Sequence, residues 1–552
     1  MKKNRIFILL SVIAIISQVI LLQSCKKEEV RYEPVYMTVS LQKSFLQNEL
    51  YYPLNYLEKS VELDFSHPID SSTMKGNISF SDRNGPLDPA CKLIYSGRKI
   101  IIAFIPGFQM LDGWKYKITI KKGLRSTSGV TLPSETVIEL RTSSKHLFLV
   151  NDTTSRNAIL CLSDIHMGDQ RSAANGYCWF TRNIAALDSL LAGVLAGSQV
   201  RQVVILGDLF DEWVVPYRFT PFDPQAGISN SRDYFMAIAN APANISIINK
   251  LKTIASGGII QLVYIPGNHD MLLTNDILQE IIPGIIWQGD SAGLGHYAPL
   301  DEIIMEHGHR FDFFNCPQPL SNPGHMLPPG YFISRLDAQG VMEQGDHPLK
   351  GMNSGTGQLE FLTAWTAAVE YLKIKYSLAV AADSSNIRMD GIDNYSAPFS
   401  YNGVRDIFAE NIENAWTETE TRNAVPVAMP VLMSIINGSN DLFLTASYEY
   451  MQPTAPKRYK IVVFGHTHNP TLKVYPPGNQ YTGIYANTGS WVNAELTSKP
   501  VRTFLVIRPA AWTGSDLDVV SLYQYNLDSG SGNQNPGFVP VLLSQESISN
   551  DE

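Results

Sequence analysis

Two patterns of apolar and polar residues divide most of the chain. Between about residues 35 and 145, short segments of alternating apolar and polar residues are separated by turn-prone stretches such as Asp82-Arg-Asn-Gly and Ser126-Thr-Ser-Gly. Alternation with a period of two is typical of strands that bury one face, and closely spaced strands of this kind are typical of an all-β sandwich. The predicted strands are 60–65, 77–80, 99–104, 115–120 and 136–141. We therefore expect an all-β sandwich over residues 35–147.

From about residue 157 the pattern changes to apolar runs that end in polar residues. Such runs begin at Ala158, Gln202, Gln261 and Lys460, and residues 179–195, between the first two, have apolar positions at helical spacing. Strands that alternate with helices indicate an α/β sheet with both faces covered. In such a sheet, ligands bind at the carboxyl ends of the strands, which is where these runs end.

Two long stretches interrupt this alternation, and the chain ends in a third irregular one. Residues 214–232 are rich in Pro and Asn, and residues 317–457 contain a Pro- and Gly-rich loop followed by helical patterns. Because structureless loops of that length are rare in compact domains, we interpret 317–457 as an inserted helical cap. The helical patterns predict helices at 359–378, 404–415 and 428–450. The end of the chain, 527–552, is predicted to be a flexible tail.

The first 25 residues have the organisation of a secretion signal. Three positive charges within the first five residues precede a nearly unbroken apolar run from Ile6 to Leu22, which ends in a small residue and Cys25. A membrane-spanning helix is the alternative, but no basic stop-transfer cluster follows the run. Leu22-Gln-Ser-Cys25 resembles a bacterial lipoprotein lipobox. The resemblance implies an exported protein, lipidated at Cys25 and anchored to the outer membrane on its periplasmic or cell-surface face.

Composition excludes several classes of protein. The 552 residues include 52 acidic and 43 basic side chains, a net charge of −9, so the chain lacks the electrostatic footprint of a nucleic-acid-binding protein. Besides Cys25, four cysteines lie far apart with no CxxC pair, which disfavours a zinc ribbon or a dense disulfide scaffold. Cys161 lies in an apolar run and is predicted to be a core residue.

Five short segments concentrate the candidate chemistry. They are Asp164-Ile-His166, Gly207-Asp-Leu-Phe-Asp211, Gly267-Asn-His-Asp270, His307-Gly-His309 and Gly465-His-Thr-His468. These 19 residues hold six of the 11 histidines. A lone histidine at a strand end is usually a hydrogen-bonded structural residue. Jointly, however, the segments supply imidazole nitrogens, carboxylates and an amide oxygen without a thiolate. That set suits manganese, iron or zinc, and it is larger than one ion requires.

In this order, the five segments resemble the motifs of the calcineurin-like metallophosphoesterase superfamily: D-x-H, G-D-x-x-D, G-N-H-D, a histidine before glycine, and G-H-x-H. The resemblance implies an α/β fold, a metallophosphoesterase-type four-layer α/β sandwich over residues 155–526. Here that domain would contain the large helical insertion 317–457 and follow the all-β, Ig-like sandwich. The resemblance also implies two divalent metal ions, Mn, Fe or Zn. The implied ligands are Asp164, His166 and His468 for the first metal, Asn268, His307 and His466 for the second, and Asp208 as the bridge.

The resemblance further implies hydrolysis of a phosphate monoester, diester or pyrophosphate by a hydroxide that bridges the two metals. His269 would stabilise the transition state or protonate the leaving oxygen. Asp211 and Asp270 would orient ligands, and contact with substrate is the alternative role for Asp211. His309 would not be a ligand, because the family's ligand precedes the glycine. Asn487-Thr-Gly-Ser-Trp491 is similar to a segment of the superfamily and supports the fold.

Two finer resemblances concern the branch and the N-terminal module. Gly207 to Trp213, with His307-Gly, is similar to the UDP-diacylglucosamine hydrolase branch, which acts on a lipid-linked pyrophosphate. Residue 269 is His, however, where many enzymes of that branch have Arg, and that enzyme works on the cytoplasmic side. We therefore carry over the fold and the reaction class, not the substrate. Phe65-Ser-His-Pro-Ile-Asp, with Leu111-Asp-Gly-Trp and Leu140-Arg-Thr-Ser, resembles bacterial Ig-like domains of the SbsA type.

The resulting hypothesis is a lipid-anchored phosphoesterase acting on a phosphorylated small molecule, lipid or glycan. Two alternatives stay open: a non-catalytic surface binding protein built on the same fold, and a nuclease of the same superfamily, which the acidic balance disfavours. We expect the cap to enclose the leaving group and to change substrate preference more than metal content. Gly289-Asp-Ser-Ala-Gly293 matches the G-x-S-x-G pattern of serine hydrolases, but the sequence after it lacks the helix which that motif requires.

Overall fold

The chain divides into two compact units, residues 1–143 and 144–552. The computed structural model describes residues 36–41, 52–54, 60–82, 85–106, 108, 110, 115–142, 156–197, 199–318, 320, 326–344, 387–392, 395, 398, 400, 404, 415–437, 441–452, 455–475, 483–513, 517–527 and 538–549. The signal and lipobox, the predicted helix 359–378 and nearly all of the predicted helix 404–415 lie outside these residues. None of the helices in the described ranges has the length and apolar character needed to cross a membrane.

The first unit contains two packed β-sheets. The strands of one, in spatial order, are β1 (Val39–Leu41), β3 (Ser60–Phe65), β7 (Lys99–Phe104) and β6 (Cys91–Ser96). Those of the other are β2 (Tyr52–Leu54), β9 (Thr136–Thr142), β8 (Lys115–Ile120), β4 (Ile78–Asp82) and β5 (Gly85–Pro86). Alternate residues of β3 and β8, among them Leu63 and Ile118, enter a common core. The unit also has the short helices η1 (Ser71–Thr73) and η2 (Asp88–Ala90). The all-β prediction for this region is confirmed.

The second unit is built on two further sheets. The seven-stranded sheet runs β13 (Ile286–Trp287), β12 (Gln261–Ile265), β11 (Val200–Leu206), β10 (Ala158–Leu162), β19 (Thr503–Arg508), β20 (Leu517–Leu527) and β21 (Phe538–Ser549). The five-stranded sheet runs β14 (His296–Leu300), β15 (Ile303–Glu306), β16 (Ile461–Phe464), β18 (Ile484–Asn487) and β17 (Thr471–Val474). Both sheets contribute to one core, in which Cys161 is buried as predicted.

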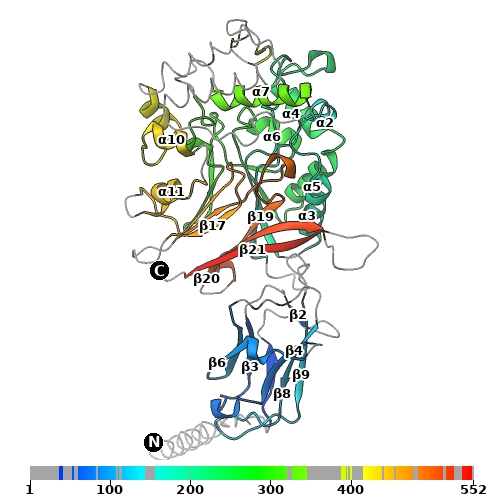
Figure 1. Cartoon of the computed structure of the whole chain (residues 1–552), viewed down its shortest axis with the longest axis vertical. Coiled ribbons are helices and arrows are strands. Elements are labelled where there is room, and N and C mark those ends of the chain that lie inside the picture. The colour runs from blue at the N-terminus through cyan, green and yellow to red at the C-terminus, as the bar shows by residue number, and fades with distance from the viewer. Residues whose placement is uncertain are drawn as a thin grey trace, which may run out of the picture. The chain divides into compact units, whose positions relative to one another are not determined.

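Helices cover the outer faces of these two sheets. α3 (Ile184–Ala196) and α5 (Ile245–Ser256) pack against each other and against strands of the seven-stranded sheet. α11 (Phe443–Ala446) and the π-helical turn η6 (Ser447–Met451) share a core with β15, β16 and β18. Figure 1 shows α3 and α5 on one side of the strands and α11 on the other. The predicted four-layer α/β sandwich is therefore confirmed.

The remaining helical elements are short, except α7. They are α2 (Gln170–Ala174), η4 (Pro224–Ala226), α4 (Ser231–Ala239), α6 (Asn275–Ile281), η5 (His309–Phe311), α7 (Pro329–Gln344), α10 (Val431–Asn437), η7 (Ala494–Leu496) and α12 (Ala510–Thr513). α7 belongs to the predicted cap. It runs above the strands of this unit in Figure 1.

Three boundaries differ from prediction. The predicted helix 179–195 begins only at Ile184, because the Asn183 amide donates to the carbonyls of Trp491 and Val492 and holds the preceding residues outside the helix. The predicted tail 527–552 is wrong in part, because residues 538–549 form β21, paired antiparallel with β20. Its apolar run contains Pro540, which an edge strand tolerates.

The third difference concerns the cap, 317–457. The helical pattern predicted at 428–450 appears as α10, α11 and η6. Tyr450 and Met451 pack against Val462 and Phe464 of the five-stranded sheet. The end of the predicted cap is therefore a layer of the core, because its apolar side chains cover a sheet face that would otherwise be exposed.

Sheet topology brings the five motifs to one edge. β10, β11 and β12 are parallel, as are β15 and β16. Each of the five motifs follows the carboxyl end of one of these strands. Motifs separated by up to about 300 residues in sequence therefore converge at this edge, as expected for α/β sheets.

Candidate metal centre

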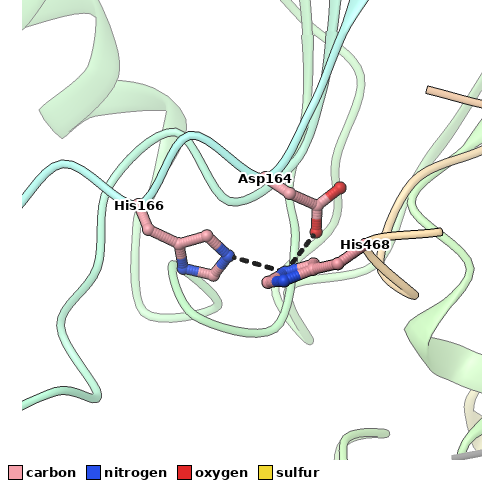
Figure 2. Close-up of side chains that lie close together, drawn as sticks. All are labelled: Asp164, His166 and His468. Atoms are coloured by element: carbon pink, nitrogen blue, oxygen red, sulfur yellow. Dashed lines mark hydrogen bonds and ion pairs between the residues drawn. The ribbon is translucent and has the colours of Figure 1, made fainter. Parts of the chain in front are cut away.

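Asp164, His166 and His468 form the first part of the centre, at the ends of β10 and β16. The His166 and His468 Nε2 atoms lie 3.0 Å apart, and His468 Nε2 lies 3.2 Å from Asp164 Oδ1 (Figure 2). The three side chains point toward one another in Figure 2. One donor atom from each lies within 4.8 Å of the others, which is compatible with a shared metal ion. These are the three residues predicted to hold the first metal.

Asn268, His307 and His466 form the second part, at the ends of β12, β15 and β16. Asn268 Oδ1 lies 3.0 Å from both His307 Nε2 and His466 Nδ1. Asp208, after β11, lies between the two parts, because its Oδ2 is 3.3 Å from His307 Nε2 and 3.6 Å from His166 Nε2. The structure thus brings together all seven predicted ligands, with the predicted bridge in the middle.

In three of the predicted histidine ligands, a hydrogen bond to one ring nitrogen directs the other nitrogen toward the centre of the site. His166 Nδ1 donates to Asp211 Oδ2 (3.1 Å), and His307 Nδ1 donates to the Leu206 carbonyl (2.6 Å). His466 Nε2 donates to Asp312 Oδ2 (3.0 Å). In a neutral ring, the other nitrogen then carries a lone pair. Each of these lone pairs faces further donor atoms of the set.

Converging lone pairs repel unless a proton or a metal cation lies among them. Asp164 Oδ1 is also buried in this set, 3.2 Å from His468 Nε2, which is itself a predicted ligand. Nitrogen and oxygen donors without thiolate suit Mn²⁺, Fe²⁺ or Zn²⁺, and seven ligands exceed what one ion takes. The residues present therefore fit two divalent cations.

Backbone strain is concentrated at the same place. Among the described residues, eight that are not glycine have positive φ, and five of these are predicted ligands. They are Asp164, His166, Asp208, His466 and His468, with φ between 53° and 69°. Each left-handed residue costs about 1–2 kcal/mol. Such strain persists only where the surroundings hold it, and it clusters at functional sites.

Two motif glycines allow the loops after β11 and β12 to approach closely. Gly207 has φ +81°, and a Cβ there would lie 2.5 Å from His307 Nδ1 and 2.7 Å from the Gly267 Cα. A Cβ on Gly267 would lie 2.6 Å from the Asp208 backbone nitrogen. Because no side chain fits in either place, these positions require glycine for steric reasons.

Asp211 links a predicted ligand to the predicted acid. Its Oδ2 accepts from His166 Nδ1, and its Oδ1 accepts from His269 Nδ1 (2.9 Å) and from the Trp213 and Val214 backbone N–H groups (3.1 Å each). The histidines hold the pKa of this buried carboxyl below its usual value although burial opposes that shift. Both oxygens are thus occupied by protein donors, which favours an orienting role.

His269 lies at the edge of the metal centre between two tryptophans. Trp213 stacks on its ring with centroids 4.5 Å apart, and the Trp179 ring lies 5.3 Å away. Burial disfavours the cation, but Asp211 and Asp208 outweigh burial and raise the pKa of His269. With Nδ1 held by Asp211, Nε2 is the nitrogen left for a reacting group.

Asp270 connects the loops after β11 and β12 by accepting hydrogen bonds from their backbone N–H groups. Its Oδ2 accepts from the Leu209 and Phe210 N–H groups and from the Tyr264 hydroxyl, and its Oδ1 accepts from the Gly267 N–H (2.8 Å). Burial and the neighbouring Asp208 raise the pKa of Asp270 to about 6. Its contacts hold the loops that carry Asp208 and Asn268.

The predicted ligand His307 has a raised pKa, so its proton competes with a metal for the same nitrogen. Burial disfavours its cation, but Asp208 and Asp164 outweigh burial, and the pKa of His307 rises to about 9. Burial, reinforced by His269, lowers the pKa of His166. His309 is buried beside His307, with ring centroids 5.2 Å apart, and burial and neighbouring histidines hold its pKa well below the ordinary value. Neither His309 nitrogen has a hydrogen-bond partner among the described residues, and His309 belongs to no candidate ligand group there.

Sequence reasoning missed several residues that support the site. Asp312 and Asn315 follow the motif His307-Gly-His309. Asp312 contacts His466, and Asn315 contacts Asn268. Trp179 and Trp213 flank His269. Of these residues, only Asp312 could have been suspected from the sequence, because it is a carboxylate five residues beyond the predicted ligand His307. The tryptophans reach His269 through tertiary packing alone, which no local pattern encodes.

The last residue of β18 and the segment that follows it also support the site. The Trp491 N–H donates to the Asp164 carbonyl (2.9 Å), and the Asn487 amide donates to the Gly465 carbonyl (2.6 Å). The Ser163 hydroxyl, which contacts the Asp164 carboxylate, also contacts Thr488. At Ser291, by contrast, a turn leads into β14 without a helix, so the serine-hydrolase motif lacks its structural context.

A protein-family model described as calcineurin-like phosphoesterase matches residues 158–470, which is more than half of the chain and contains all seven predicted ligands. The comparison with curated proteins finds no match.

Similar solved structures include the N-terminal part of the bacterial S-layer protein SbsC, with 14% identity, TM-score 0.14, and coverage of 24% of this chain and 29% of that one. CopC from Methylosinus trichosporium OB3b has 16% identity and TM-score 0.15, covering 20% and 92%. GAP50 of Plasmodium has 10% identity and TM-score 0.21, covering 70% and 90%. This chain thus spans less than a third of the SbsC structure. Similarity at these TM-scores supports no conclusion about function.

Proposed function

This chain belongs to the calcineurin-like phosphoesterase family, and on that premise we propose that it is an exported, lipid-anchored enzyme that hydrolyses a phosphate monoester, diester or pyrophosphate with two divalent metals. One observation carries the catalytic part of the proposal: the seven predicted nitrogen and oxygen ligands from five strand ends lie close together, and three of the histidines are oriented with one ring nitrogen toward the centre. A merely structural site would not require this many unshared donor atoms at one point.

Each of the predicted site residues would have a separate role in binding metal or in proton transfer. Two bound divalent ions would supply a hydroxide at neutral pH and neutralise charge on the phosphate oxygens. Asp208 would hold the pair together, with Asp164, His166 and His468 on one side and Asn268, His307 and His466 on the other. His269 Nε2 would donate a proton to the leaving oxygen, while Asp211 fixes the ring through Nδ1. Asp270 would keep the ligand-bearing loops in place.

We propose a phosphorylated small molecule, lipid or glycan as substrate. The lipobox-like sequence at Cys25 supports attachment to the outer membrane, and an exported site has access to such compounds. The similarity to the UDP-diacylglucosamine hydrolase branch supports the reaction class only, because His269 stands where many of its enzymes have Arg. The Ig-like unit would act as a spacer between the anchor and the catalytic unit.

Activity against a panel of substrates tests the proposal. The full-length chain, purified in detergent with Mn²⁺, is given phosphomonoesters, phosphodiesters, pyrophosphates and duplex DNA, and its metal content is measured in parallel. We expect hydrolysis of at least one small phosphoester and two metals per chain. Two bound metals without hydrolysis would favour the binding protein, and cleavage of DNA alone would favour the nuclease.

Fractionation of cells tests the anchor. The wild-type chain should be recovered with the outer membrane, whereas Cys25→Ala should abolish lipid labelling and membrane retention. Equal membrane recovery of both proteins would refute lipidation at Cys25. Digestion of intact cells by an added protease then distinguishes the surface from the periplasmic face.

A further inference from the structure

Two predicted ligands of the second metal are joined by a chain of hydrogen bonds on the side away from the metal centre. His466 Nε2 donates to Asp312 Oδ2 (3.0 Å), which also accepts from the Asn315 amide. The Asn268 amide nitrogen donates to Asn315 Oδ1 (3.2 Å). The two ends of the chain are the atoms Asn268 Oδ1 and His466 Nδ1, 3.0 Å apart. Asp312 and Asn315 thus connect ligands that come from two different sheets.

The direction of each bond determines which atoms face the centre. Because the buried Asp312 carboxylate accepts only, His466 must place its proton on Nε2, which leaves a lone pair on Nδ1. Asn315 gives its amide hydrogens to Asp312, so its oxygen is directed toward Asn268. That oxygen fixes the Asn268 amide with the nitrogen outward and Oδ1 inward. Both ligand atoms are therefore oriented by the same four-residue segment, 312–315.

The first turn of α7 packs directly on this segment. The Gly330 N–H donates to the Phe314 carbonyl (2.7 Å). A Cβ on Gly330 would lie 2.6 Å from Asn315 Oδ1, 2.7 Å from the Phe314 carbonyl oxygen and 3.1 Å from Trp213 Cζ3. The approach is closer than any side chain allows, so a change at Gly330 must displace either α7 or Asn315.

α7 is also held firmly against the unit. The buried Arg335 guanidinium donates to the carbonyls of Val215 (3.2 Å), Pro216 (3.4 Å) and Phe219 (2.6 Å). The Tyr331 ring packs edge-on against Trp213, with centroids 5.9 Å apart. Because Tyr331 and Arg335 hold the start of α7 just after the Gly330 contact, movement of this part of the helix would be transmitted to Asn315.

From these contacts we infer that Asp312 and Asn315 are positioning residues for the second metal and that docking of α7 sets their geometry. The inference rests on the proposed function for the identity of the two metals. It also revises the expectation that the cap would affect substrate preference more than metal content. Residues that orient metal ligands in this way typically change metal affinity by about 10–100-fold when replaced.

Mn²⁺ binding to the full-length chain tests the inference, by titration calorimetry and by electron paramagnetic resonance. Wild type should bind two Mn²⁺ and give the spectrum of a coupled pair. Asp312→Ala, which removes the acceptor of His466 Nε2, and Gly330→Ala should weaken one Mn²⁺ by about 10–100-fold, leave the other unchanged and give the six-line spectrum of a single ion. Ser334→Ala, one turn further along α7, is the matched control and should bind as wild type does.

Wild-type affinities and a coupled spectrum in both variants would overturn the inference. Asp312→Ala removes the acceptor without adding volume, so it provides the test where Gly330→Ala does not fold. The proposed function fails separately, if wild type holds two Mn²⁺ but hydrolyses no phosphoester. Loss of both ions in Asp312→Ala would also overturn the inference, because it would indicate collapse of the whole site instead of one ligand set.

Discussion

Asp211→Asn separates an orienting role for Asp211 from contact with substrate. In wild type, Oδ1 accepts from two backbone N–H groups and from His269, while Oδ2 accepts from His166 alone. An asparagine has one acceptor oxygen, and three donors hold that oxygen at the Oδ1 position. Its NH₂ group must then face His166 Nδ1, which already carries a proton.

This conflict should weaken binding of the first metal, because His166 is one of its predicted ligands. His166 relieves the conflict by moving its proton from Nδ1 to Nε2, the nitrogen predicted to bind metal. The variant loses one buried hydrogen bond to a charged group, about 1.5–3 kcal/mol. Since 1.4 kcal/mol is a factor of ten, we expect affinity for one Mn²⁺ to fall by about one to two powers of ten. His269 keeps its contact with Oδ1, so the proton donor remains in place.

Calorimetric titration with Mn²⁺ and steady-state kinetics on an aryl phosphate measure both effects. At saturating Mn²⁺ the variant should recover most of its kcat with an unchanged KM. Asp188→Asn carries the same change at a partly exposed ion pair on α3 and should behave as wild type. A raised KM with unchanged Mn²⁺ affinity would refute this reasoning and assign Asp211 to substrate binding.

Three further predictions follow from the site. His269→Ala should lower kcat by about 10²–10⁴-fold while both metals stay bound, as kinetics and metal analysis will show; an unchanged kcat would remove His269 from the chemistry. Gly207→Ala should destabilise the apoprotein by about 2–5 kcal/mol in urea unfolding, because its Cβ would meet His307 Nδ1 at a φ of +81°; a loss below about 1 kcal/mol would contradict the steric argument. The pKa of His307 is raised from 6.5 to about 9, so its proton stabilises the apoprotein fully below pH 6.5 and is lost as pH rises through 9. Metal must displace that proton, so Mn²⁺ affinity should rise about tenfold per pH unit between 6.5 and 9; a flat profile would show that no proton is displaced.

The sequence predicted the strands and the ligands for the same physical reason. Strands buried on both faces are continuous apolar runs, such as 158–162, and polar residues appear where the chain leaves the sheet. Parallel strands place those residues at one edge, whereas the division of the ligands between two metals, such as Asp164 with His468, came from the resemblance of the motifs to the superfamily. The close approach of the loops at Gly207, by contrast, was not predicted from the sequence.

What the sequence did not predict depends on contacts between distant segments. Trp179 was placed in a helix because its neighbours have helical spacing, but hydrogen bonds from Asn183 to residues 491 and 492 hold it beside His269. β21 was missed because the polar composition after Asn526 was extended to the end of the chain. The Asp312–Asn315 connection depends on where α7 packs, and the spacing of apolar residues in the sequence does not indicate that position.

Hydrolysis by wild type and Asp208→Asn, with metal content determined on the same samples, tests the central claim most directly. Asp208 Oδ2 lies between the two halves of the centre, 3.3 Å from His307 Nε2 and 3.6 Å from His166 Nε2. We predict that wild type binds two divalent ions and hydrolyses a phosphoester, and that Asp208→Asn loses at least one ion and the activity with it. Equal hydrolysis by the two proteins, or wild type that hydrolyses nothing with any divalent metal, would contradict the assignment of a dimetal phosphoesterase.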